Sequence, residues 1–151
     1  MDSGCIVFVL ASLNFGGAER HTATLINHYT RTHRVVVVYL RSSSQLLEII
    51  QVDRLSGLVC LEAKGKLDIA AIRRLAGVYR SFKASMVVCV NLYPLLYVQA
   101  ARLISNTRLR VVEVFHTTLL RSNAERAQMH IYRVLLRFTD RLVFVCENQR
   151  L

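Results

Sequence analysis

The chain has 151 residues, of which 53% are hydrophobic, and it carries a formal net charge of +10. A single domain of this length buries a substantial core, and so apolar a composition excludes an intrinsically disordered chain. Arginine supplies nearly all of the positive charge, which favours anionic partners such as nucleotide phosphates, acidic glycans or phospholipid surfaces.

The N-terminus and the apolar runs argue against targeting and membrane-spanning segments. Asp2 stands where a secretory signal needs positive charge. The apolar run at 5–13 and all later runs are too short to span a bilayer. We therefore expect a cytoplasmic protein, either soluble or peripheral at the inner face of the cytoplasmic membrane.

The cysteines and histidines give little support to a metal site. Cysteine stands at four separated positions without a Cys-x-x-Cys pair: Cys5, Cys60, Cys89 and Cys146. Each lies in or at the end of an apolar, β-branched stretch, so we expect buried free thiols in a reducing compartment. The sequence predicts neither a bound metal nor a cofactor.

Apolar runs alternate with helical periodicity along the chain. Strands are expected at 5–12, 35–40, 58–61, 86–90, 110–115 and 142–146, and helices at 18–30, 45–50, 67–83, 94–104 and 123–138. Strands that lack polar alternation are buried on both faces, as in a parallel sheet covered by helices. The pattern predicts an α/β fold, a Rossmann-like doubly wound parallel sheet with helices on both faces and strand order 3-2-1-4-5-6.

The loop after the first strand is the strongest candidate for a binding site. Gly16 and Gly17 stand at a strand-to-helix turn, where the absence of a Cβ lets a ligand approach the backbone. The free N–H groups of the following helix favour a phosphate, and its dipole also favours Glu19 in the first turn. The alternative is a tight turn followed by an acid at a helix start.

A dinucleotide site fits the residues less well. The Gly-x-Gly-x-x-Gly spacing is absent, and the second strand ends without an acid that could bind a ribose hydroxyl. Arg41 at that strand end could meet a 2′-phosphate, so an NADP protein stays open as an alternative.

Several segments together resemble the N-terminal domain of the family-four-like glycosyltransferases. The loop Phe15-Gly16-Gly17-Ala18-Glu19-Arg20 is similar to the signature loop of that family, and later segments match in order: 67–75, 87–90, 112–116 and 139–147. The resemblance implies one half of a GT-B fold, in which two Rossmann-like domains face each other. The N-terminal domain mostly holds the acceptor and the C-terminal one the nucleotide-sugar. Because the chain ends soon after the sixth strand, we expect the donor-binding domain to be absent and residues 1–151 to be inactive alone.

The resemblance also implies an activity and residue roles. It implies a retaining hexosyl transfer from a nucleotide-sugar to a lipid-linked or polysaccharide acceptor. His116 would hydrogen-bond the donor sugar as the catalytic residue, Gly16 and Gly17 would form the substrate- or phosphate-binding loop, and Glu19 and Arg20 would hold its shape. The chain departs from the family at 91–93, where a histidine is common, and at Cys146, where a serine is common.

A basic stripe in the last predicted helix suggests a second partner. Arg126, Arg133 and Arg137 recur at helical spacing beside an apolar face, as in helices that bind anionic membrane surfaces. The alternative is a solvated face whose apolar side packs inward. A non-catalytic anion- or membrane-binding Rossmann-like domain is therefore the alternative function. Nucleic-acid binding rests on charge alone and lacks a recognisable module, so we expect no nucleic-acid partner.

Overall fold

The computed structural model describes residues 4–14, 16–42, 45–65, 67–115 and 123–144. Six strands form one sheet in the order β3-β2-β1-β4-β5-β6, and all neighbours are parallel. The strands are β1 (Cys5–Leu10), β2 (Val35–Tyr39), β3 (Gly57–Cys60), β4 (Ala84–Val90), β5 (Arg110–Phe115) and β6 (Arg141–Phe144). The predicted Rossmann-like fold class and strand order are both confirmed.

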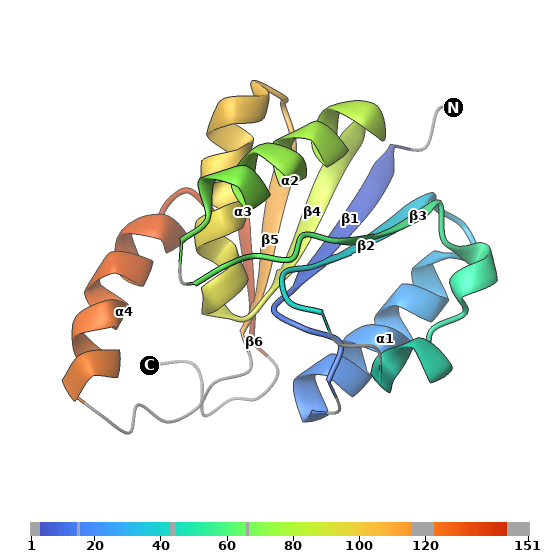
Figure 1. Cartoon of the computed structure of the whole chain (residues 1–151), viewed down its shortest axis with the longest axis horizontal. Helices are drawn as coiled ribbons and strands as arrows, with labels where there is room; N and C mark the ends of the chain where they lie inside the picture. The colour runs from blue at the N-terminus through green and yellow to red at the C-terminus, as the bar shows by residue number, and fades with distance from the viewer. Residues whose placement is uncertain (1–3, 15, 43–44, 66, 116–122, 145–151) are drawn as a thin grey trace.

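Helices cover both faces of this sheet (Figure 1). The α-helices are α1 (Gly17–Tyr29), α2 (Ile69–Ser81), α3 (Leu92–Ser105) and α4 (Asn123–Leu136), and two short 3-10 turns are η1 (Gln45–Glu48) and η2 (Val52–Arg54). Within the described ranges, no helix is long and apolar enough to cross a membrane.

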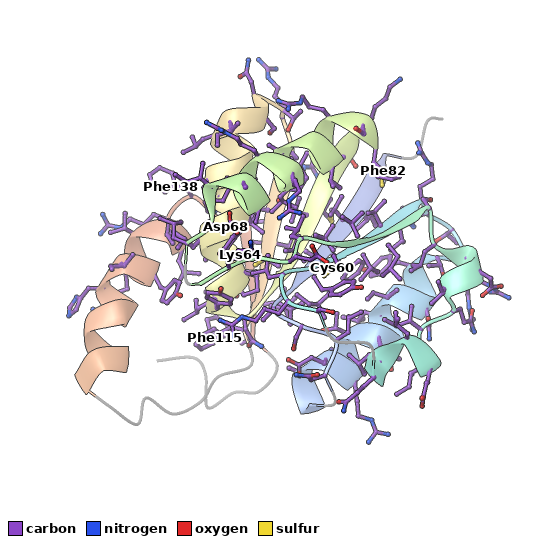
Figure 2. All side chains as sticks on the ribbon, in the orientation of Figure 1. Cys60, Lys64, Asp68, Phe82, Phe115 and Phe138 are labelled. Carbon is purple, nitrogen blue, oxygen red and sulfur yellow. The ribbon has the colours of Figure 1, made fainter. Side chains whose placement is uncertain are left out.

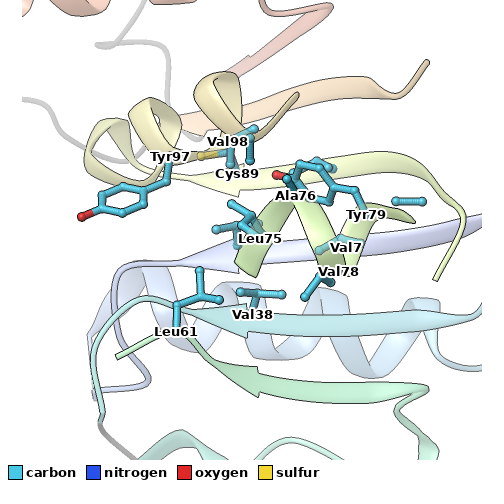
Figure 3. Packing of buried hydrophobic residues seen from close by; sticks show 14 of the residues in the cluster. Val7, Val38, Leu61, Leu75, Ala76, Val78, Tyr79, Cys89, Tyr97 and Val98 are labelled. Carbon is cyan, nitrogen blue, oxygen red and sulfur yellow. The ribbon is translucent and has the colours of Figure 1, made fainter. Parts of the chain in front are cut away.

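Alternate residues of the central strands enter two separate cores, which explains the unbroken apolar runs. Val7 and Val9 of β1 pack with α2 and α3, whereas Ile6 and Phe8 pack on the side that α1 covers. Figure 3 shows Val7 of β1 next to Leu75 and Val78 on the apolar face of α2. Burial on both faces is the arrangement that favours β-branched residues in parallel strands.

The expected buried stripe of α2 is mostly correct, with one error. Ile72, Ala76 and Tyr79 are buried, but Ile69 is 61% exposed. The helix begins at Ile69 after the N-cap Asp68, so this first residue precedes the part of α2 that lies over the sheet. Helical spacing alone could not reveal that end effect.

The described cysteines are free thiols. Cys5 and Cys89 are buried as expected, whereas Cys60 is only half-buried. Burial raises the pKa of both Cys5 and Cys89, so these two thiols stay protonated in the neutral range. Cys146 lies outside the described residues.

Candidate functional site

The carboxyl ends of the strands and the first turns of α1 and α3 lie at one edge of the sheet (Figure 1). Gly16 is the N-cap of α1 in an extended conformation, with φ −151°, and as a glycine it has no side chain that could cap the helix. Its carbonyl accepts the backbone N–H of Arg20 at 3.0 Å, which closes the first turn. The first N–H groups of an α-helix have no partner within the helix and suit an anion. Because the Glu19 carboxylate lies over the N-cap, a phosphate or another anionic ligand at the start of α1 would have to displace that side chain.

The two glycines of this loop differ in what surrounds them. A Cβ at Gly16 would meet the carboxylate of Glu19, so that side chain lies over the N-cap. A Cβ at Gly17 would meet no protein atom within 4 Å, and the backbone of Gly17 does not have a positive φ. Neither local strain nor a neighbouring side chain requires glycine at position 17. The remaining explanation for glycine at this position is that a ligand approaches the backbone through the open space at this edge of the sheet.

A second group of residues joins three loops at the same edge. Arg41 follows β2, and its guanidinium carbon lies 5.3 Å from the ring centroid of Tyr93 in the first turn of α3. The Tyr93 hydroxyl donates to the carbonyl of Gly65, in the loop after β3, at 2.8 Å. The sequence interpretation considered Arg41 only for a 2′-phosphate and assigned no role to Tyr93.

Asp68 fixes the end of the loop that follows β3. Its carboxylate accepts the backbone N–H groups of Ala70 at 2.9 Å, Ala71 at 3.1 Å and Lys64 at 2.9 Å. These three hydrogen bonds lower the pKa of the Asp68 carboxyl, and the bond from the Lys64 N–H has the largest effect. Figure 2 shows Lys64 and Asp68 close to each other on this loop, and Phe115 at the carboxyl end of β5.

The loop between β4 and α3 takes an unusual conformation. Asn91 lies in the left-handed region with φ 67°, which asparagine tolerates better than most residues. Its backbone N–H donates to the carbonyl of Val114 at 3.0 Å, which ties the ends of β4 and β5 together. Asn91 is the N-cap of α3, and its side chain makes no cap hydrogen bond.

The structure brings together one part of the predicted site. Gly16, Gly17, Glu19 and Arg20 lie together at the start of α1, with Arg20 exposed. His116 lies outside the described residues, directly after β5.

The predicted membrane residues lie elsewhere, on and after α4. Arg133 in the last turn of α4 and Arg137 just beyond it are exposed. The side chain of Arg126 lies outside the part of the chain that the structure describes. The described ranges contain no group of three His, Cys, Asp or Glu side chains that could hold a metal ion.

Comparison with known proteins agrees with this arrangement. The model of Glycosyltransferase Family 4 matches residues 15–150. The fold is similar to that of the lipopolysaccharide outer core galactosyltransferase WaaB in its apo form, with a TM-score of 0.70 and 13% sequence identity over 97% of this chain. The chain spans 40% of the length of that transferase, and no curated protein sequence matches it significantly. Because the family match covers nearly the whole sequence, the chain belongs to Glycosyltransferase Family 4, and its sheet has the Rossmann-like fold of one half of a GT-B glycosyltransferase.

Proposed function

We propose that residues 1–151 form the acceptor-side domain of an enzyme that transfers a hexosyl group from a nucleotide-sugar to a lipid-linked or polysaccharide acceptor. The observation that carries this proposal is the open space at Gly17, in the first turn of α1 at the carboxyl edge of the sheet. Ligands of doubly wound sheets bind at that edge, near the point where the strand order reverses. In this protein that point lies between β1 and β4.

The chemistry of this edge suits positioning and charge stabilisation. The free N–H groups and the dipole of α1 favour an anionic group, and the absence of a Cβ at Gly17 allows a substrate to reach the backbone. His116, directly after β5, would hydrogen-bond the sugar, and the reaction would retain the anomeric configuration. Fixed donors of this kind lower a barrier by stabilising charge as it develops on the leaving phosphates.

Acceptor-dependent transfer tests the proposal. The protein encoded by the complete reading frame should release nucleotide diphosphate from at least one UDP- or GDP-sugar, and only when a glycan or lipid-linked acceptor is present. Failure with every donor in a broad acceptor pool would contradict the proposed activity.

Residues 1–151 on their own should release no nucleotide above background with the same donors and acceptors. In a GT-B architecture the nucleotide-sugar is held mainly by the other half, and this chain corresponds to 40% of the solved galactosyltransferase. Release by residues 1–151 that rises in proportion to their concentration would show that the donor also binds here.

A specific observation favours an anionic membrane surface as a further partner. Ile131, Val134 and Phe138 are 61%, 54% and 63% exposed, so this part of the apolar side of α4 does not pack inward. The inward side is formed instead by Tyr132, which is buried, and by the half-buried Leu135 and Leu136. Exposed apolar residues beside Arg133 and Arg137 suit contact with anionic headgroups.

Vesicle binding tests this partner. The domain should pellet with phosphatidylglycerol-rich vesicles but not with neutral ones, and salt should weaken binding because exposed charges are screened beyond about 8 Å. Replacing Arg126, Arg133 and Arg137 with glutamine should reduce binding at least several-fold. The matched control is Arg73→Gln with Arg74→Gln on the exposed face of α2. Equal loss in the control, or equal binding to both vesicle types, would leave α4 as an ordinary solvated face.

A further inference from the structure

We propose that Arg41, held on the ring of Tyr93, binds an anionic group of the acceptor, either a phosphate or a carboxylate. The inference rests on the proposed function and adds the chemical class of the acceptor to it. It follows from the position of Arg41, from the way Tyr93 is anchored, and from the free donors of the guanidinium.

Arg41 reaches across the end of a strand. Its backbone N–H donates to the carbonyl of Ala11 at 3.0 Å, so its main chain lies beside the end of β1. Tyr93 belongs to the first turn of α3, which follows β4. Since β1 lies between β2 and β4 in the sheet, a side chain that runs from the end of β2 to Tyr93 spans the end of β1. The Arg41 guanidinium therefore lies where the strand order reverses.

Tyr93 is a fixed platform for this cation. Its hydroxyl donates to the Gly65 carbonyl at 2.8 Å. Its ring makes an edge-to-face contact with Tyr97, with the centroids 5.8 Å apart, and Tyr97 is fully buried. A hydrogen bond on one side and a buried ring on the other restrict the motion of Tyr93. The stacked guanidinium is held in turn.

The guanidinium keeps its hydrogen-bond donors available. Among the described residues the one ion pair is that between Arg102 and Asp140, and Arg41 has no described hydrogen-bond acceptor. The contact with the ring occupies no hydrogen-bond donor of the guanidinium, so its N–H groups remain available for a planar anion. Asp68, on the same loop as Gly65, makes no described contact with Arg41, and its carboxylate accepts three backbone N–H groups.

Other positive groups at this edge support the same ligand class. The positive end of the α1 dipole follows the loop that continues from Ala11, beside which Arg41 lies, and the Glu19 carboxylate lies over it. Lys64 is exposed next to Gly65. An arginine fork combined with a helix N-terminus suits phosphate or carboxylate oxygens. A neutral hydroxyl group would gain little from the positive charge of the guanidinium or from the positive end of the helix dipole.

Titration of the 151-residue chain tests the site directly. The probes are glycerol 3-phosphate and glucuronate, with glycerol and glucose as their neutral counterparts, and the readout is the Nε–H resonance of Arg41. Both charged probes should shift this resonance saturably, and the neutral ones should not. Tyr93→Leu should weaken binding at least fivefold, and Tyr93→Phe, which keeps the ring and loses the bond to Gly65, should weaken it less.

Matched arginine variants complete the test, read from the backbone amides of Gly17 and Asn91. Arg41→Gln should abolish saturable binding, while Arg80→Gln, an exposed arginine in the last turn of α2, should bind as wild type does. Equal response to charged and neutral probes, or wild-type binding by Arg41→Gln, would overturn the inference. A response to only one charged probe would keep the site and identify the anion as phosphate or carboxylate.

Transfer assays separate this inference from the proposed function. In the protein from the complete reading frame, Arg41→Gln should raise KM for a charged acceptor tenfold or more, with kcat within about twofold and KM for the nucleotide-sugar unchanged. If transfer occurs and Arg41→Gln leaves the acceptor KM unchanged, the inference fails and the proposed function stands. If no transfer occurs but the titration behaves as expected, the proposed function fails and the anion site stands.

Discussion

Replacing Glu113 with glutamine should stabilise the fold by about 4–5 kcal/mol at pH 8 and by only about 1 kcal/mol at pH 5. Glu113 lies on β5 and is fully buried, and neither carboxylate oxygen has a hydrogen-bond partner among the described residues. Its neighbour across the sheet is Cys89. Burial raises the pKa of the Glu113 carboxyl to about 8.

The direction of the effect follows from proton binding. An unfolded glutamate has a pKa of about 4.3, so between roughly pH 4.3 and 8 the native state holds a proton that the unfolded chain has released. Stability therefore falls as pH rises through this window, by at most about 1.4 kcal/mol per unit. Below this window Glu113 is protonated in both the native and the unfolded state, so it no longer contributes to the pH dependence of stability. Glutamine keeps the shape of the side chain and cannot ionise.

Urea unfolding of wild type and Glu113→Gln at pH 5, 6.5 and 8 measures this difference. The exposed carboxylate variant Glu48→Gln is the control and should follow wild type at each pH. A constant difference between Glu113→Gln and wild type across the three pH values would mean that Glu113 does not hold a proton in the native state.

The sheet could be predicted from the sequence because its signal is local. Every predicted strand except 110–115 contains an unbroken run of at least four apolar residues. Each predicted strand agrees with the structure to within a few residues where both are described. Parallel pairing and the right-handed crossover rule then leave few possible strand orders. The 3-10 turn at Val52–Arg54 was not predicted, because a single turn leaves no periodicity in the sequence.

The site could be predicted only where its residues are contiguous. Gly16 to Arg20 are contiguous at the start of α1, so a motif was enough to find them. Arg41, Gly65 and Tyr93 are distant in sequence and come together only because β2, β3 and β4 end at one edge of the sheet. No spacing rule connects them. The buried Glu113 was likewise read only as part of an apolar strand, since its neighbours in space decide its ionisation.

Helix α4 shows the limit of helical periodicity. Its apolar residues form one wide arc, in which Ile131 and Leu135 are neighbours, Val134 lies at one margin and Tyr132 at the other. Periodicity locates the arc but does not decide which part of it packs against the rest of the fold. The structure buries Tyr132 and exposes Ile131 and Val134, so the arginines lie beside an open apolar surface.

Gly17→Ala should reduce turnover tenfold or more without lowering thermal stability. An added Cβ at Gly17 would meet no protein atom within 4 Å. Gly17 is the first residue of α1, and its φ is not positive. A compatible Gly→Ala change stabilises a protein by about 0.4–1 kcal/mol. A tenfold loss corresponds to about 1.4 kcal/mol of transition-state stabilisation. The methyl group would therefore obstruct only a ligand that approaches the α1 backbone.

Gly77 supplies the matched control. It lies within α2, and a Cβ there also meets nothing within 4 Å. Gly77→Ala should give a similar or larger gain in stability, because glycine inside a helix is unfavourable relative to alanine. Both variants add one methyl group to a helical glycine. They differ in position, because Gly17 lies at the carboxyl edge of the sheet and Gly77 lies within α2.

The ratio of kcat/KM for acceptor-dependent sugar transfer between Gly17→Ala and Gly77→Ala, measured in the protein from the complete reading frame, tests the central claim most directly. If the carboxyl edge at α1 binds the substrates, Gly17→Ala should retain a tenth or less of the wild-type value, and Gly77→Ala should retain nearly all of it. Melting temperatures of both variants should equal or exceed that of wild type. Nearly wild-type transfer by a folded Gly17→Ala protein would contradict the assignment of this edge as the substrate site.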